Sequence, residues 1–380
     1  MNEELEIEED KIVDGHVVDG HVVNPFSTKD IKITNATIAL SSLISRLEHK
    51  EIDLNPDFQR NGNLWNRKQM SRLIESILLK LPLPIFYFDV SNPNKWIVVD
   101  GLQRLSTLKK FIVNELDNQS NTKGFNLVDL EFLDLNGKNY TELDRSFKRI
   151  INETQIITYQ IEAQTPKEVR YSLFNRINTG GLTLNTQEIR QALNQSGDGV
   201  RFLQEISENE TFKDVVGLSS KRMRDRELVL RYIVFKLSIF EEFKFGKMRE
   251  YLDKAMEKLD SIEDKSELQG IKETFIDTLK FTVKIFGEKH KFSRSIANKV
   301  STKTLNQSLF DVITVCFSEI KNKELFLEKK DVFLERFIPL IEDEHGKFSK
   351  AITEGTSDRG TIETRFEIMN KLIKEVLNEN

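Results

Sequence analysis

The residue types best suited to chemistry stand together in the segment Asp100-Gly101-Leu102-Gln103-Arg104. The apolar run 96–99 before it predicts a strand, and the pattern over 102–114 predicts a helix, so the segment is expected to be a strand-to-helix turn. Glycine lets the backbone approach a ligand, and the N–H groups at a helix start attract anions. Arginine adds a planar fork that suits phosphate oxygens. The turn therefore indicates a phosphate site.

A helical-wheel argument gives this turn two interpretations. Its helix should bury an apolar face made of Leu105, Leu108, Phe111 and Ile112. Arg104 falls within that arc, so its charge must either be paired or reach into a cleft. In the first case Arg104 forms a salt bridge and Asp100 only caps the helix. Gln103 and Thr107 are expected to face away from the apolar arc.

Two more segments could contribute to a ligand site. The segment Asn55 to Arg60 is rich in hydrogen-bond donors, with Gln59 and Arg60 at its end, and its alternative is an ordinary surface loop. Phe174 to Gly181 places Asn175 and Asn178 at a helix end before two glycines, which could form an anion-binding nest. A helix C-cap explains those glycines without a ligand.

Several familiar chemistries lack their residues. No GxxxxGK[ST] loop and no GxSxG elbow occurs, and the five histidines show neither metal-ligand spacing nor a His-Asn-His nuclease signature. The single cysteine, Cys316, lies in an apolar run and is expected to be buried and inert. The basic run containing Lys221, Arg222 and Arg224 could contact DNA phosphates, although such a run is often a solvated helix start.

The composition favours a soluble, helix-rich globular protein. The chain has 380 residues, of which 38% are hydrophobic and 31% charged, and its net charge of −5 argues against non-specific DNA coating. No apolar run is long enough to cross a bilayer and the acidic start is no secretory signal, so a cytoplasmic protein without membrane contact is expected. The length suggests two domains and a tail.

The elements that must position the turn follow from periodicity and turn residues. Helices are expected at 36–49, at 70–81 before Pro82 and Pro84, at 142–151 and from Pro166 to Asn178. Strands are expected at 85–90 and 95–99 around a hairpin turn, weakly near Phe125 and Glu131, and at 154–161. Asn185 and Glu188 predict a capping box that starts another helix. Beyond about 205 the pattern is almost wholly helical.

These elements predict an α+β fold with three segments. Residues 1–28, which include a tandem Asp-Gly-His-Val-Val repeat, form an acidic tail; its two histidines could bind a metal weakly, but a short β-like or disordered segment explains them better. Residues 29–205 form an α+β domain, and residues 206–380 form a mostly α-helical domain.

Three elements in this order resemble the N-terminal domain of GmrSD-type restriction endonucleases, which carries a DGQQR motif and is similar to the ParB/sulfiredoxin fold. They are Pro56-x-Phe58-Gln59-Arg60 with Trp65, then Val98-Val99-Asp100-Gly101-x-Gln103-Arg104, then Phe174-Asn175-Arg176-Ile177-Asn178 followed by Glu188-Ile189-Arg190. The resemblance covers about residues 35–195. It implies nucleotide binding or hydrolysis in bacterial defence against foreign DNA, with Arg60 in the same pocket. Leu102 replaces the first motif glutamine, and the C-terminal half lacks the nuclease signature that often accompanies this domain.

The sequence thus predicts a nucleotide-binding protein, with nucleoside triphosphatase activity as its extension, in a restriction or anti-phage system. Arg60 and Arg104 would hold phosphates, and the nucleotide would be surrounded by Gln59, Gly101, Thr107, Asn175 and Asn178. The catalytic residues would be Asp100, which positions Mg²⁺ or water, Gln103, which orients the ligand, and Arg104. The partners implied are a nucleotide, DNA, and a separate effector or nuclease subunit. The alternatives are a non-catalytic DNA-binding or protein-interaction module, with Lys221, Arg222 and Arg224 on DNA, and a nuclease with an unrecognised site.

Overall fold

The computed structural model describes residues 6–7, 28–54, 65–114, 124–177, 185–194, 197–218, 223–242, 247–287, 291–296 and 304–379. The described residues between His21 and Leu193 form one compact unit, the sheet unit. Residues from Asn194 onward, together with the short strand β1 (Glu6–Ile7), form a second, the helical unit. Among the described residues, no helix is both long and apolar enough to cross a membrane.

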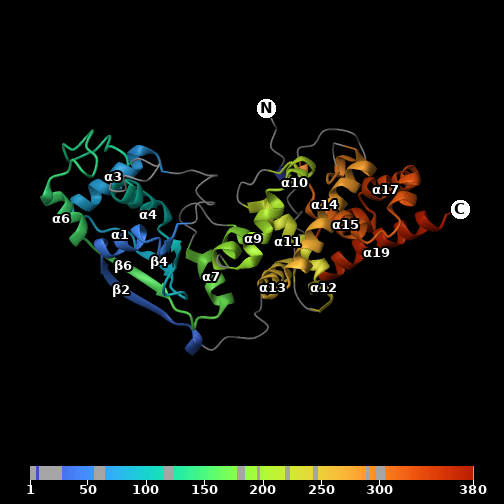
Figure 1. The fold of residues 1–380 in the computed structure, drawn as a ribbon, viewed down its shortest axis with the longest axis horizontal. Helices are drawn as coiled ribbons and strands as arrows, with labels where there is room; N and C mark the ends of the chain where they lie inside the picture. Colours follow the sequence, from blue (N-terminus) through green and yellow to red (C-terminus); the bar gives the residue numbers. More distant parts are fainter. Residues whose placement is uncertain are drawn as a thin grey trace. The chain divides into compact units, whose positions relative to one another are not determined.

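The sheet unit is built around a mixed five-stranded sheet (Figure 1). Its strands lie in the order β2-β6-β4-β5-β3, with β2 antiparallel to β6, β6 parallel to β4, β4 antiparallel to β5, and β5 parallel to β3. The strand bounds are β2 Ile33–Ala39, β3 Ile52–Asp53, β4 Phe86–Asp89, β5 Trp96–Asp100 and β6 Gln155–Ile161. The helix bounds are η1 Thr28–Asp30, α1 Leu40–Glu48, α3 Arg67–Leu78, α4 Leu102–Leu108, the π-helical η2 Lys109–Val113, α6 Arg145–Glu153, α7 Lys167–Ile177 and α8 Thr186–Leu193.

Strand alternation gives this sheet two apolar faces. Phe86 and Phe88 point to one face, where α1, α3, α4, η2 and α6 complete the larger core. Val99 and Ile161 point to the other face, where Phe174 of α7 and Ile189 of α8 cover them in a smaller cluster. The turn after β5 is therefore held between helices on both faces of the sheet.

The helical unit confirms the helical pattern predicted beyond about 205. The bounds of its elements after β1 are α9 Asp198–Ser207, α10 Glu210–Val216, α11 Arg224–Lys236, α12 Ile239–Glu242, α13 Met248–Ser261, α14 Lys265–Phe286, η5 Arg294–Ile296, β7 Thr304–Leu305, α15 Gln307–Ser318, α16 Lys323–Glu328, α17 Lys330–Glu342, α18 Lys347–Thr353 and α19 Arg359–Asn378. β1 pairs with β7 in parallel. Cys316 is buried as predicted, and burial raises the pKa of its thiol.

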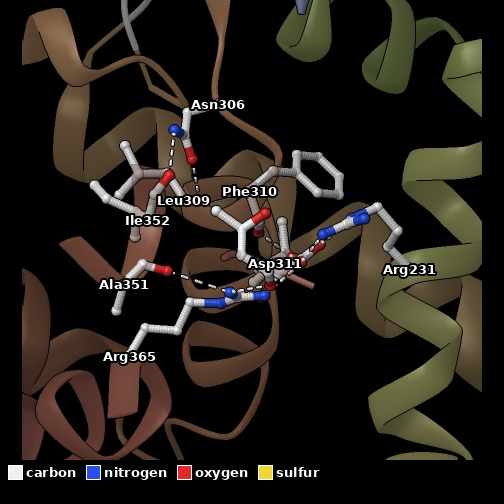
Figure 2. A network of polar contacts seen from close by, with 10 residues as sticks. Arg231, Asn306, Leu309, Phe310, Asp311, Ala351, Ile352 and Arg365 are labelled. Carbon is white, nitrogen blue, oxygen red and sulfur yellow. Dashed lines mark hydrogen bonds and ion pairs between the residues drawn. The ribbon is translucent and has the colours of Figure 1, made fainter. Parts of the chain in front are cut away.

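One buried carboxylate joins three helices of the helical unit. Asp311 of α15 accepts hydrogen bonds from Arg231 of α11 at 2.9 Å and 2.6 Å, and from Arg365 of α19 at 3.3 Å. Figure 2 shows the carboxylate between the two guanidinium groups. Arg365 also donates to the carbonyl oxygens of Ala351 and Thr356. The cluster thus ties α11, α15 and α19 together inside the core of the helical unit.

Most predicted elements are confirmed, and three details are wrong. Residues 36–39 belong to β2 and not to the predicted helix 36–49, which begins at Leu40. The segments near Phe125 and Glu131 are irregular loop with bends, not strands. α3 ends at Leu78, so Leu81 is not part of its buried stripe and is 49% exposed. The hairpin of β4 and β5 and the capping box of Asn185 and Glu188 are present.

Candidate functional site

The backbone of the Asp100 turn explains why it contains glycine. Gly101 lies between β5 and α4 with φ 104°, a conformation that side-chain-bearing residues rarely adopt. A Cβ at this position would lie 2.5 Å from Cδ1 of Phe86. The absent side chain therefore lets α4 start directly above the end of β5, packed against Phe86.

Arg104 is paired inside the protein, as the first interpretation of the apolar arc required. Its side chain is only 9% exposed, and Nη2 donates to Oδ2 of Asp100 at 2.8 Å and to the carbonyl oxygen of Ile85 at 3.2 Å. Nη1 donates to the carbonyl oxygen of Pro84, and the guanidinium stacks 4.2 Å from the centre of the Phe86 ring. Burial lowers the pKa of Arg104, while the Asp100 carboxylate opposes that shift. Arg104 thus fastens the start of β4 to the turn.

Asp100 is the exposed member of that pair. Its side chain is 40% exposed, while one of its two oxygens is oriented by Arg104. A carboxylate held from behind by a guanidinium, and open to solvent in front, keeps a fixed direction. The geometry therefore presents a negative oxygen beside the start of α4.

Gln103 connects this turn to the segment that carries Gln59 and Arg60. Its Oε1 accepts a hydrogen bond from the backbone N–H of Trp65 at 3.3 Å. β3 runs parallel to β5 and leads through buried Leu54 toward the same end of the sheet as Asp100. Residues 55–64 lie outside the described part of the chain. The two residues that flank them, Leu54 and Trp65, both lie at the end of the sheet where β5 leads into the turn.

Two further positions of α4, Thr107 and Leu102, pack into the protein. Thr107 is buried at 1% exposure and donates to the carbonyl oxygen of Gln103 at 2.8 Å, so the expectation that it faces away from the buried side is wrong. The π-helical continuation of α4 and the packing around it bury both sides of this short helix. Leu102 packs against the larger core, consistent with an apolar role at that motif position.

Other predicted residues lie outside what the structure describes. These are Gln59, Arg60, Asn178, Lys221 and Arg222, while Asn175 lies in α7 with its side chain undescribed. Arg224 is exposed at the first position of α11, whereas Arg226, two residues on in the same basic run, is buried at 7% exposure. Burial removes Arg226 from any surface that could contact DNA.

Two polar clusters near the sheet were not predicted from the sequence. Buried Glu75 of α3 accepts hydrogen bonds from the backbone N–H groups of Glu131, Phe132 and Leu133 at 2.7–3.0 Å. Its only sequence signal is an acid on the buried side of an amphipathic helix. Burial acts to raise the pKa of Glu75, but these bonds and Arg72 outweigh it, so the net shift is downward.

The second unpredicted cluster joins α7 to the β4–β5 hairpin. Arg170 donates to Oδ2 of Asp89 at 3.3 Å and to the hydroxyl oxygen of Ser91. Asp89 is fully buried, and its other oxygen accepts from the backbone N–H of Ser91 at 2.9 Å. An acid at a strand end before a turn is the only sequence signal for this cluster. Its contacts hold the helix that covers the second face of the sheet.

The turn offers a single carboxylate, Asp100, so it could hold a metal ion only together with the phosphate oxygens of a bound ligand. In the described part of the chain, no three His, Cys, Asp or Glu side chains gather closely enough to hold a metal ion by themselves. Mg²⁺ in nucleotide sites is commonly bound by one or two carboxylates, with phosphate oxygens and water completing its shell. The partly exposed carboxylate of Asp100 fits that single-carboxylate role.

The structure thus combines an α+β domain with an Asp-Gly-x-Gln-Arg turn that joins the sheet strand β5 to the buried helix α4. Residues 40–195 match the family described as "GmrSD restriction endonuclease, N-terminal domain", so this part of the chain is a GmrSD N-terminal domain, as the motifs predicted. The domain is thus of the kind found in restriction systems. No curated protein and no solved structure shows a significant match to the chain.

Proposed function

We propose that the sheet unit binds a nucleoside triphosphate at the Asp100 turn, and that the chain acts in a restriction or anti-phage system. The observation that carries this proposal is the gathering of three features at one end of the sheet. They are the exposed carboxylate of Asp100, the start of α4 after Gly101, and the anchors of the segment with Gln59 and Arg60. The family's description as a restriction endonuclease domain supports the cellular role.

The contacts of Arg104 give it a positioning role and leave phosphate binding to other residues. Arg104 positions Asp100 and the start of α4, because its guanidinium is already engaged with protein oxygens. Arg60 and Gln59 would then be the main phosphate ligands, with Asn175 and Asn178 as further contacts to the nucleotide. Gln103 would couple the turn to that binding segment through Trp65.

A magnesium ion would be held by Asp100 and the ligand's phosphates. Such an ion neutralises phosphate charge and so favours both binding and phosphoryl transfer. Asp100 would orient it because Arg104 fixes the direction of the carboxylate. Hydrolysis of the nucleotide is a further step of the proposal, and DNA cleavage would fall to a separate nuclease subunit.

Thermal unfolding with a panel of nucleoside triphosphates and Mg²⁺ tests the proposal. A ligand at about 100 times its dissociation constant should stabilise the sheet unit by about 2.7 kcal/mol. Asp100→Asn and Arg60→Ala should each remove most of that gain, whereas Arg224→Ala, on the exposed start of α11, should keep it. The proposal fails if no nucleotide stabilises the wild type more than it stabilises Asp100→Asn and Arg60→Ala.

A further inference from the structure

β2 is the outermost strand at one end of the sheet. It pairs with β6 over seven residues, from Ile33 to Ala39, without any shift of register. In the described part of the chain, no other strand pairs with its outer side, and Figure 1 shows it as the blue arrow along the border of the sheet. It precedes residues 40–195, so it lies outside the part matched by the family.

The hydrogen-bond ladder shows which residues face outward. Glu162 donates to the carbonyl oxygen of Lys32 at 3.0 Å, and Leu40 donates to that of Thr154 at 2.8 Å. Because bonded pairs alternate along an antiparallel ladder, the even-numbered residues of β2 bond to β6. The N–H and C=O groups of Ile33, Asn35 and Thr37 therefore point away from β6.

This edge lacks the features that usually protect an edge strand. Its sequence, Ile-Thr-Asn-Ala-Thr-Ile-Ala, contains no charge and no proline, and its register contains no bulge. The sheet face beside it carries two exposed isoleucines. Ile33 is 38% exposed and Ile157 of β6 is 51% exposed, and register places both on the same face. An unprotected edge beside exposed isoleucines is suited to pairing with another strand.

We infer that β2 pairs with β2 of a second copy of the chain, antiparallel and about a two-fold axis at Asn35. Such an axis sets Asn35 opposite its own copy and Ile33 opposite Thr37, so these outward-facing residues form ladder pairs. A charged residue at the centre would meet its own charge, which makes an uncharged central residue a requirement for this pairing. An uncharged strand also offers no complementary charge to select a foreign partner.

The side chains at this centre complement themselves. The amide of Asn35 is both donor and acceptor, so two copies can bond to each other. The pairing joins two five-stranded sheets into one of ten strands. It also brings the exposed Ile33 and Ile157 of both copies onto one continuous face, where the added strands shield part of their surface.

Light scattering on the full chain tests this pairing through charge exchange. The wild type should show twice the single-chain mass of 44.2 kDa. Asn35→Lys and Asn35→Asp should each show the single-chain mass, because like charges meet at the axis. An equimolar mixture of the two should recover the doubled mass. A wild type of single-chain mass, a dimeric Asn35→Lys, or a mixture that stays monomeric each overturns the inference.

Cysteine cross-linking tests the register independently. Bonded residues opposite each other in an antiparallel pair lie about 5.5 Å apart between Cα atoms, within the range for a disulfide. Asn35→Cys should therefore form a covalent dimer under mild oxidation, while the matched Thr37→Cys should not. The native Cys316 is buried and does not compete. Cross-linking of Thr37→Cys in preference to Asn35→Cys refutes the axis at Asn35.

Discussion

The buried cluster around Asp311 predicts an asymmetry between removing its anion and removing one of its cations. Asp311→Asn leaves Arg231 and Arg365 buried with no carboxylate between them. Arg231→Met instead leaves one balanced pair, Asp311 with Arg365, and fills the vacated space with an apolar side chain of similar length. Although Arg231 makes two of the three bonds, we expect the loss of Asp311 to be the costlier change.

The magnitude follows from the cost of stranding buried charges. Breaking a buried ion pair by removing one partner costs about 3–5 kcal/mol. Asp311→Asn should lie at the upper end, about 5 kcal/mol, because two cations lose their common anion. Arg231→Met should lie at the lower end, about 3 kcal/mol. With a shift of about 2–4 °C per kcal/mol for a unit of this size, the melting temperature should fall by about 10–20 °C and about 6–12 °C respectively.

Two spectroscopic probes can assign the change to the helical unit. The only two tryptophans, Trp65 and Trp96, both lie in the sheet unit, so their fluorescence reports its unfolding. Far-ultraviolet circular dichroism is dominated by helix and reports mainly on the helical unit. Asp277→Asn provides a surface control, because its ion pair with Lys280 is long, at 3.9 Å, and both side chains are exposed.

The expected result is a fall in the dichroism midpoint for both core variants, larger for Asp311→Asn, with little change in tryptophan fluorescence. The control should change stability by less than about 0.5 kcal/mol. If Arg231→Met costs as much as Asp311→Asn or more, the reasoning from charge balance is refuted. The loss of hydrogen bonds alone would then explain the cluster's contribution.

Three other changes follow from the contacts. Gly101→Ala should destabilise the sheet unit by about 1–3 kcal/mol in urea unfolding, because of its positive φ and the contact with Phe86, whereas Gly270→Ala, in open space within α14, should be neutral or stabilising. The pKa of Glu75 is lowered on folding, so Glu75→Gln should be less stable than wild type at neutral pH, and the difference should shrink as pH falls below 4.5; a constant difference would contradict this. Cys316 should resist alkylation until the chain unfolds, since burial raises the pKa of its thiol.

Local periodicity predicted the elements whose pattern is complete in one segment. α3 carries its apolar residues at helical spacing, and β4 and β5 surround a polar turn, so each was predictable without knowledge of distant residues. β2 was missed because Ile38 fits both a helical stripe and an alternating strand. Pairing with β6, which lies more than a hundred residues away in the sequence, decides that this segment forms a strand.

The same distinction separates the predicted from the unpredicted parts of the candidate site. The helical spacing of the apolar residues showed that Arg104 must be paired or must reach into a cleft, because all the residues needed for this inference lie on one helix. It could not show that the partners include the carbonyl oxygens of Pro84 and Ile85, which carry no sequence signature. Backbone oxygens are available wherever the fold brings them, so an arginine in a motif has a structural alternative that only three-dimensional contacts reveal.

The contacts of Arg104 determine which variants can test the motif. A variant of Arg104 would release Asp100, the start of β4 and Phe86 together, so lost nucleotide binding in that variant would not distinguish ligand contact from collapse of the turn. Asp100→Asn keeps the size of the side chain and a hydrogen-bond acceptor for Arg104 while removing the exposed charge. It therefore isolates the negative oxygen, the one feature of the turn that a magnesium–nucleotide complex would use directly.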